Sequence, residues 1–199
     1  MKIRHIIIIT LTCALCIIAI CFPCCTKLVK ISDSSMYPTL QDGDILLTWK
    51  AHKNSAKNIR GRIIVFYFPF GEYDDRIHAS RNNIYVKRCT GVPGDTVFFK
   101  TNDNTDLNRP HLKYYDWICD HPVIVPYKGY RIPLNDSTTS LYRKLILYET
   151  DDWNYCNNID KTYYTFQGNY FFAIGDNQSS SYDSRHWGFI PESFIISYR

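Results

Sequence analysis

Apolar and polar positions divide the chain of 199 residues into one long apolar segment near its start and many short apolar runs after it. Residues 6–22 carry no charge and are mostly apolar. At helical rise, about 17 such residues are just enough to cross the hydrocarbon core of a bilayer. Basic residues flank the segment on both sides. Lys2 and Arg4, which precede it, favour a cytoplasmic N-terminus. We therefore expect a tail at residues 1–5, a transmembrane helix at 6–22, and the rest of the chain outside the cytoplasm.

A cleaved secretory signal is the alternative for this first segment, because the same basic and apolar regions would serve it. However, no small-x-small cleavage pattern follows, since residues 21–25 read Cys-Phe-Pro-Cys-Cys. Bulky Ile20 and Phe22 also stand where a lipid-modified cysteine would need small neighbours. We therefore expect the segment to be retained as an anchor.

The remainder of the chain has the pattern of a β-rich domain, with short apolar runs broken by Gly, Pro, Asn and Asp. Strands are expected at residues 28–31, 45–50, 62–68, 83–91, 96–100, 123–126, 163–166, 170–175 and 193–198. One helix is expected at 138–148, with Ser137 as its N-terminal cap and Leu141, Leu145 and Tyr148 on one face.

Residues 101–167 are richer in Asp, Asn and Tyr than the segments around them. They also separate two expected strands that each lead into a distinctive motif. We interpret 101–167 as an inserted cap subdomain, which leaves 28–100 and 168–199 as the main β domain.

Composition and charge change this picture little. The net charge of +4 and the 16 Tyr and 11 Phe residues could suggest nucleic-acid binding, but the basic residues never form a run, so we expect no nucleic-acid partner. Five of the eight Cys lie in or beside the apolar leader, leaving Cys89, Cys119 and Cys156. At most one internal disulfide can form among these, with Cys119–Cys156 as our choice, and three free thiols are the open alternative.

A serine-rich turn follows the first expected strand. Residues 32–40 read Ser-Asp-Ser-Ser-Met-Tyr-Pro-Thr-Leu, and Pro38 fixes the backbone soon after Ser35. A serine at the end of a strand is suited to attack a carbonyl, although most loop serines have no such role. Its hydroxyl becomes a nucleophile only when a base removes the proton.

Lys87 is the candidate base. It lies in an expected strand in which alternation places Tyr85, Lys87 and Cys89 on one face and Val86 and Arg88 on the other. If Arg88 faces solvent, Lys87 faces inward, where burial lowers its pKa from about 10.4 toward neutrality. A neutral amine can accept the serine proton. The competing interpretation is a strand lysine that extends to water.

A third motif, residues 175–188, follows an apolar strand and is dense in hydroxyl and amide groups. Such a loop can orient a catalytic amine by hydrogen bonds, but it can equally be a plain turn. Asp183 and Arg185 could form an ion pair that braces the loop, and an exposed pair would contribute only about 0.2–1 kcal/mol.

Together these segments resemble the type I signal peptidase family of serine proteases. Ser-Met-x-Pro-Thr is similar to the family's nucleophile box, and Tyr-Val-Lys-Arg-x-x-Gly-x-Pro-Gly-Asp to its lysine box. Gly-Asp-Asn followed by Ser-x-Asp-Ser-Arg-x-Trp-Gly resembles the last box, with the same order and spacing. Residues 60–66 resemble the box that supplies a substrate-facing strand, whereas 101–167 is only loosely similar to the family's cap regions.

The resemblance implies a mainly β fold: a β-barrel or sandwich catalytic domain with an inserted cap, behind one N-terminal transmembrane helix. It also implies removal of leader peptides from exported preproteins, with cleavage after small residues of the Ala-x-Ala type. The implied partners are preprotein signal peptides and the lipid bilayer. We expect a monomer in a bacterial-type inner membrane, with its catalytic domain on the outer side and no metal or organic cofactor.

Residue by residue, the resemblance implies Ser35 as nucleophile and Lys87 as general base. Ser181 would orient the lysine, and Asp183 and Arg185 would brace it. The substrate would bind extended, in pockets lined by apolar residues: Ile31, Met36, Leu40, Ile64, Phe66, Tyr85 and Val86.

Asp33 departs from the family pattern. Family members carry Ser or Gly two residues before the nucleophile, and the nucleophile's backbone N–H donates to the oxyanion. An ionised carboxylate cannot donate and would repel that charge. Asp33 must therefore point away, be protonated, or leave the oxyanion to the backbone alone. Smaller departures at Arg62 and Gln178 leave room for a specialised substrate set.

Three alternatives to a signal peptidase were weighed. A self-cleaving repressor with a Ser/Lys pair would carry an N-terminal DNA-binding domain, where this chain has an apolar segment. A related conjugative or pilin-processing peptidase fits the same motifs. A catalytically inactive, membrane-tethered binding module would retain the fold, and Asp33 favours this alternative.

Overall fold

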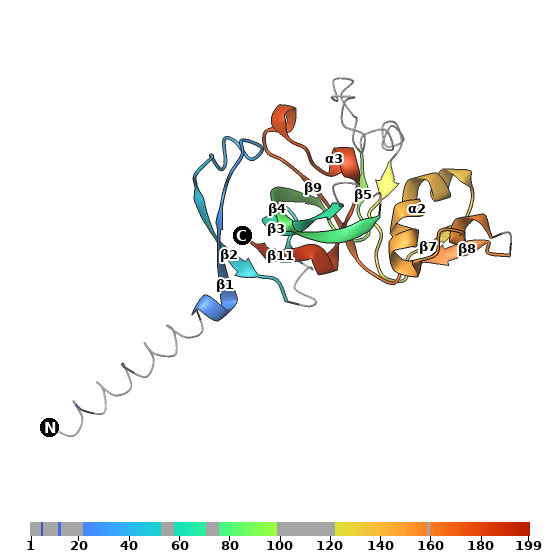
Figure 1. Cartoon of the computed structure of the whole chain (residues 1–199), viewed down its shortest axis with the longest axis horizontal. Helices are drawn as coiled ribbons and strands as arrows, with labels where there is room; N and C mark the ends of the chain where they lie inside the picture. Colours follow the sequence, from blue (N-terminus) through green and yellow to red (C-terminus); the bar gives the residue numbers. More distant parts are fainter. Residues whose placement is uncertain are drawn as a thin grey trace.

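The computed structural model describes residues 5, 12, 22–52, 58–70, 76–98, 122–158 and 160–199. The described chain is mainly β, as predicted (Figure 1). Its largest sheet has the strand order β1-β2-β11-β3-β4-β9-β10. These strands are β1 (Thr26–Lys30), β2 (Ile45–Lys50), β3 (Ile63–Phe70), β4 (Ile77–Gly91), β9 (Tyr170–Ile174), β10 (Ile190–Pro191) and β11 (Ile195–Tyr198).

Two small sheets, two α-helices and a helical stretch at residues 22–25 complete the α and β structure of these residues. The small sheets pair β5 (Thr96–Val97) with β6 (Val123–Ile124), and β7 (Arg131–Pro133) with β8 (Tyr163–Thr165). The α-helices are α2 (Asp136–Thr150) and α3 (Ser184–Trp187), and 3₁₀ turns are η3 (Tyr155–Asn157), η4 (Gln178–Ser180) and η5 (Glu192–Phe194). The sequence pattern did not predict β7, β10 or α3, each of which is too short to show a period.

The strands differ from the expected ones mainly at their ends. β4 begins at Ile77, well before the expected start at residue 83, because it pairs with β3 through register shifts after Tyr67. Ser193 lies in η5 and not in a strand. Neither the irregularly paired part of β4 nor the 3₁₀ turn shows an alternation of apolar and polar residues, so the sequence pattern could not locate these strand ends.

The expected helix forms, but its cap is Asn135 and the predicted cap Ser137 is wrong. The Asn135 side chain accepts the Thr138 N–H at 3.0 Å, and the Thr138 hydroxyl accepts the Asn135 N–H at 3.2 Å. This reciprocal capping pair satisfies two backbone donors and starts α2 earlier. The buried face is formed by Tyr142, Leu145, Ile146 and Leu147.

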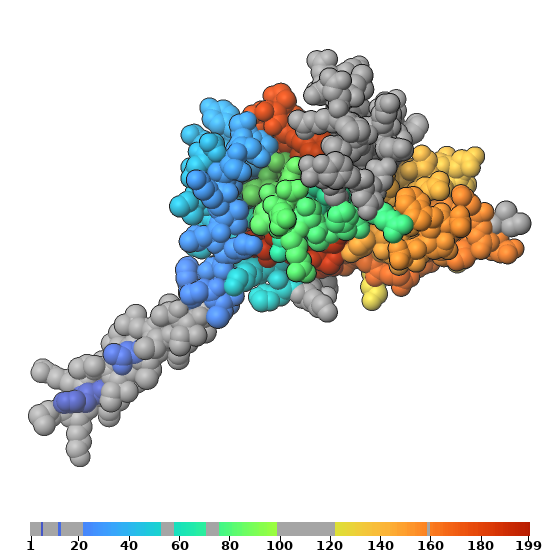
Figure 2. Space-filling model, in the orientation of Figure 1, coloured from blue at the N-terminus to red at the C-terminus, as the bar shows by residue number. Residues whose placement is uncertain are grey.

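The described part of 101–167 shares its core with the main sheet. One hydrophobic cluster contains Phe66 and Trp187 together with Tyr142 and Phe166. In Figure 2 this segment (yellow and orange) lies at one end of the molecule and the β1–β2 hairpin (blue) at the other. A second, smaller cluster is formed by Ile31, Met36, Leu40, Leu46 and Ile63.

Two predictions fall wholly or partly outside the described residues. Of the expected span at 6–22, only Thr12 and Phe22 are described, and none of the helices that the structure describes has the length and apolar character to cross a membrane. Cys119 also lies outside them. Among the described residues Cys89 and Cys156 are free thiols, and the suggested Cys119–Cys156 pairing lies partly outside the described residues.

Candidate active site

Ser35 and Lys87, 52 residues apart in the sequence, meet in a buried hydrogen bond. Lys87 Nζ donates to Ser35 Oγ at 2.5 Å. Ser35 is 4% exposed and Lys87 1%. Lys87 Nζ also lies 5.3 Å from the centroid of the Tyr85 ring, so the predicted shared face of Tyr85 and Lys87 is confirmed.

Burial lowers the pKa of Lys87, while the negative charges of Asp33 and Asp183 partly oppose that shift. An ammonium group loses its hydration in a buried site, and the neutral amine is disfavoured less. Lys87 therefore exists as a neutral base over a wider pH range than an exposed lysine does.

The backbone of the nucleophile turn is fixed by local hydrogen bonds. Ile31 N–H donates to the Asp44 carbonyl at 2.9 Å, and Leu40 N–H donates to the Met36 carbonyl at 3.0 Å. Within this turn the Ser35 N–H donates to Asp33 Oδ1 at 2.8 Å. Asp33 therefore does not point away from the nucleophile.

Asp33 is held in its ionised form. Burial alone would raise the pKa of its carboxyl, but hydrogen bonds from Ser35 and the charge of Lys87 outweigh this effect and lower it. Of the three possibilities for Asp33, a protonated carboxyl is thus disfavoured as well.

The loop after β9 holds the nucleophile turn from the other side. Asn177 N–H donates to the Ser35 carbonyl at 2.9 Å. The Asn177 side chain donates to the Ser34 carbonyl at 3.1 Å. The Thr39 hydroxyl donates to Asp176 at 2.5 Å. Two consecutive residues of this loop, Asp176 and Asn177, thus hold the nucleophile turn.

Arg88 connects the same loop to the strand that carries Lys87. Its Nε and Nη2 donate to the two oxygens of Asp176 at 2.7 and 2.5 Å. It lies on the opposite face of β4 from Lys87, as alternation predicted. The lysine strand and the nucleophile turn are therefore both tied to Asp176.

Asp183 and Arg185 form a buried pair and not the exposed one that was considered. The Asp183 side chain is fully buried and accepts Arg185 Nε at 2.8 Å and Nη2 at 2.9 Å. It also accepts the Gly175 N–H at 3.0 Å. Burial would raise the pKa of Asp183, but the nearby His186 ring and hydrogen bonds from Arg185 and Gly175 hold it well below its usual range.

Gly175 is a residue whose role the motif analysis missed. A Cβ at this position would lie 2.2 Å from Ser181 Oγ and 2.6 Å from the Ser35 carbonyl oxygen. Only glycine permits this approach of three segments. Ser181 Oγ itself is buried without a hydrogen-bond partner among the described groups, so the expected bond to Lys87 is not made in this state.

The apolar residues suggested to line substrate pockets fall into two groups. Ile31, Met36 and Leu40 are in the small cluster, with partly buried Val86 packed against them. Ile64, Phe66 and Tyr85 pack with the main cluster, where Ile64 and Phe66 are fully buried. The small cluster contains Met36, the residue directly after the nucleophile.

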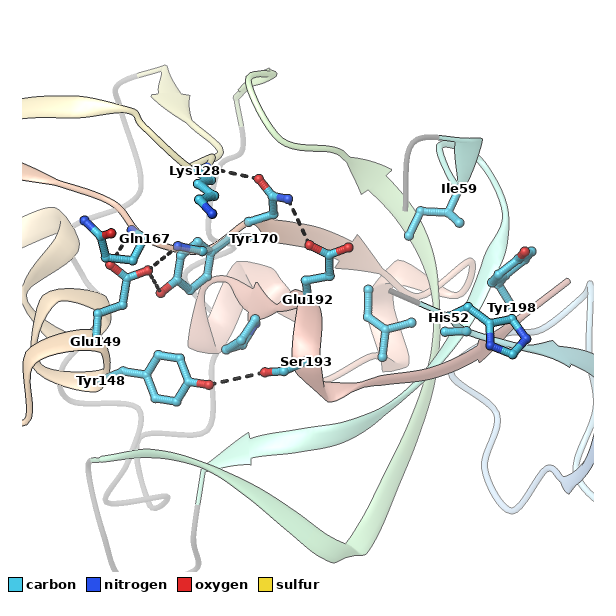
Figure 3. A pocket seen from close by; sticks show the side chains of 15 residues that line it. His52, Ile59, Lys128, Tyr148, Glu149, Gln167, Tyr170, Glu192, Ser193 and Tyr198 are labelled. Atoms are coloured by element: carbon cyan, nitrogen blue, oxygen red, sulfur yellow. Dashed lines mark hydrogen bonds between the residues drawn. The ribbon is translucent and has the colours of Figure 1, made fainter. Parts of the chain in front are cut away.

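A cavity of about 720 Å³ lies between the C-terminal end of α2, β9 and β11 (Figure 3). Its carboxylate Glu149 accepts the hydroxyl groups of Tyr164 and Tyr170 at 2.5 and 2.9 Å, and the N–H groups of Gln167 and Gly168 at 2.8 Å. Glu149 therefore acts structurally. No group of three or more His, Cys, Asp or Glu able to hold a metal ion occurs in the part of the chain that is described.

Comparison with known proteins agrees with these motifs. The family model for signal peptidase, peptidase S26, matches residues 3–198. The chain belongs to this family. Among family members, signal peptidase I of Bacillus caldolyticus is 30% identical over 90% of this chain and 82% of its own length. Signal peptidase IB of Staphylococcus aureus (strain COL) is 31% identical over 83% of this chain and 71% of its own length. Signal peptidase I of Buchnera aphidicola (subsp. Baizongia pistaciae) is 28% identical over 84% of this chain, which covers 66% of that relative.

Proposed function

We propose that this peptidase S26 family member is a membrane-attached endopeptidase that removes N-terminal signal peptides from exported preproteins. Ser35 is the nucleophile and Lys87 the general base. The observation that carries this assignment is the buried hydrogen bond between Lys87 Nζ and Ser35 Oγ at 2.5 Å. A base within hydrogen-bonding reach of a nucleophile is the geometry that acyl transfer requires.

The reaction follows from this pair. Neutral Lys87 takes the hydroxyl proton as Ser35 Oγ attacks the scissile carbonyl carbon, and the Ser35 N–H donates to the oxygen that becomes negative. The Lys87 ammonium then gives its proton to the leaving amine, and an acyl-enzyme ester remains. Water attacks this ester while Lys87 again accepts a proton, and Ser35 recovers its hydroxyl proton when the acid product leaves.

The small cluster is compatible with the specificity that we propose. Ile31, Met36 and Leu40 are buried beside the nucleophile with Val86 packed against them, and we infer that this apolar cluster forms the floor of sites for small side chains of the Ala-x-Ala type. Ile64, Phe66 and Tyr85 support it from the main core. The buried Asp183–Arg185 pair, with Ser181, keeps the loop after β9 in place against Ser35.

The β1–β2 hairpin supports attachment to a lipid bilayer. Four of its exposed side chains are large and apolar, beside exposed Lys30: Leu28 (66%), Ile45 (70%), Leu47 (41%) and Trp49 (51%). Phe22, at the end of the apolar segment 6–22, packs edge-on against Trp49 at 6.5 Å. We infer that segment 6–22 spans the membrane once, that the hairpin touches its surface, and that the catalytic domain acts as a monomer on the outer side. A β-barrel or sandwich closure of the domain belongs to the same proposal.

The test is cleavage of a model preprotein by the full chain in detergent. We expect wild type to release the signal peptide after an Ala-x-Ala sequence, Ser35→Ala and Lys87→Ala to be inactive with unchanged circular dichroism, and Ser32→Ala, an exposed serine of the same turn, to retain activity. Cleavage by Ser35→Ala would remove the nucleophile assignment. A folded wild type that binds preprotein without cutting it would favour the inactive binding module, and preference for a pilin precursor over the preprotein would favour the pilin-processing alternative.

A further inference from the structure

Asp33 binds the backbone N–H of the nucleophile residue, the group that the proposed reaction needs for the oxyanion. Its Oδ1 accepts the Ser35 N–H at 2.8 Å, an Asx turn formed with the residue two positions on. The Ser35 hydroxyl is at the same time bound to Lys87 Nζ. In the free protein both polar groups of Ser35 that take part in the proposed reaction are therefore already hydrogen-bonded.

The partner of the N–H is an anion. An ionised carboxylate accepts hydrogen bonds and cannot donate them. The tetrahedral intermediate places a second negative oxygen on the same N–H, so the two oxygens compete for one proton. Asp33 lies at an exposed position, from which its carboxylate can turn into water without being buried.

We propose that Asp33 is a positioning residue that keeps the Ser35 N–H hydrogen-bonded in the free protein. A scissile carbonyl must then displace the Asp33 carboxylate from this N–H before the oxyanion can form. This inference rests on the proposed function. Binding of the rest of an extended substrate supplies the free energy for the displacement. A short or poorly fitting peptide supplies less, so Asp33 restricts turnover to substrates that fill the site.

The same charge also affects the base. Lys87 faces two carboxylates, Asp33 and Asp183, and the ring of Tyr85; Asp183 is already paired with Arg185. Asp33 in turn faces Ser35 and Lys87. Its negative charge stabilises the Lys87 ammonium and opposes the effect of burial on the Lys87 pKa. Removing that charge shifts the formation of the neutral amine to lower pH.

Two substitutions separate these effects. Asp33→Ala removes both the acceptor and the charge, whereas Asp33→Asn retains an acceptor oxygen for the Ser35 N–H and removes only the charge. Asp42→Asn is the matched control, because it makes the same change of charge at an exposed aspartate of the following turn. The assay is kcat and KM of the full chain in detergent, from about pH 6 to about pH 10, on a peptide with Ala-x-Ala before the scissile bond.

We expect Asp33→Ala to raise kcat/KM at pH 7 about tenfold, mainly in kcat, the factor that corresponds to loss of one charge-assisted hydrogen bond. Asp33→Asn should give a smaller gain, and both variants should move the pH midpoint of kcat/KM downward. Asp42→Asn should match wild type. A peptide aldehyde, whose adduct with Ser35 places an oxygen on the same N–H, should bind about tenfold more tightly to Asp33→Ala, while an uncleavable peptide of the same sequence binds equally well to both.

The proposal is overturned if folded Asp33→Ala has kcat at or below wild type, or if the peptide aldehyde binds it no more tightly than it binds wild type. If Asp33→Ala does not fold, Asp33→Asn decides the outcome, because its neutral acceptor competes less for the Ser35 N–H, and kcat at or below wild type in this variant would overturn the proposal. Failure of the proposed function gives a different result, because wild type would then be inactive or Ser35→Ala active.

Discussion

Gly175→Ala should inactivate the protein although Gly175 has no side chain and takes no part in the chemistry. The new Cβ would lie 2.2 Å from Ser181 Oγ and 2.6 Å from the Ser35 carbonyl oxygen, where ordinary contact begins at 3.4 Å. Because the new Cβ clashes with both, the Ser181 loop and the Ser35 turn must each move away from residue 175 by about 1 Å. A misplacement of about 1 Å can lower the rate of an oriented reaction by about 100-fold. We expect kcat to fall by at least that factor.

Gly91→Ala is the control that separates damage to the site from damage to the core. Its Cβ would lie 2.7 Å from Val97 Cγ1 and 2.9 Å from Phe172 Cβ, so it crowds the interior without contacting the Ser35 turn. Overpacking costs about 1–3 kcal/mol, or a few degrees of melting temperature at about 2–4 °C per kcal/mol for a protein of this size. We expect Gly91→Ala to lose stability and keep kcat, measured by thermal unfolding and peptide cleavage. Gly175→Ala with wild-type kcat, or equal loss of kcat in both variants, would refute the reasoning.

Three further predictions concern the base, the buried pair and the hairpin. Because burial lowers the pKa of Lys87, kcat/KM should rise with pH through one ionisation below the ordinary lysine value of about 10.4, and Lys87→Arg should be inactive throughout; a flat profile would place the base elsewhere. Because the pKa of Asp183 is depressed, its contribution to stability is complete above about pH 4 and is lost as the pH falls further, so the melting temperature should drop between about pH 4 and about pH 2 in wild type and less so in Asp183→Asn; equal acid sensitivity would contradict this. In vesicles with brominated lipids, the fraction of tryptophan fluorescence that the lipid quenches should fall in Trp49→Phe and stay the same in Trp153→Phe, which removes a comparably exposed tryptophan from the turn after α2; the reverse would argue against hairpin contact with lipid.

Alternation along a single strand predicted that Lys87 and Arg88 point to opposite sides, and an inward Lys87 followed only if Arg88 faces solvent. A period of two fixes which side chains share a face, and adjacent Lys87 and Arg88 must then point to opposite sides. The structure agrees: Lys87 is 1% exposed, and Arg88 lies on the other face, paired with Asp176. The pairing of Lys87 with Ser35 came from the family motifs, because no local pattern relates residues 52 apart.

The burial of Asp183 could not be predicted from sequence. A carboxylate next to hydroxyl residues in a loop is usually solvated, and an exposed pair with Arg185 would contribute little. Here the carboxylate caps α3 and accepts the Gly175 N–H, so it connects a four-residue helix to the end of β9. That role depends on the packing of β9 against the rest of the sheet, which a pattern within residues 175–188 does not contain.

The distance between Ser35 and Lys87 is set by the loop that follows β9, and by neither residue's own segment alone. Asn177 holds the Ser35 carbonyl, Asp176 holds both Thr39 of the nucleophile turn and Arg88 of the lysine strand, and Gly175 allows them to approach. A substitution in this loop can therefore increase the distance between the Ser35 hydroxyl and the Lys87 amine, although both residues are unchanged. Asp33 acts instead on the Ser35 N–H, so changes at Asp33 should alter the hydrogen bond available to the oxyanion while the distance between the hydroxyl and the amine stays the same. Loss of kcat without a shift of the pH midpoint thus indicates damage to the loop, and a lowered midpoint with raised kcat indicates loss of charge at Asp33.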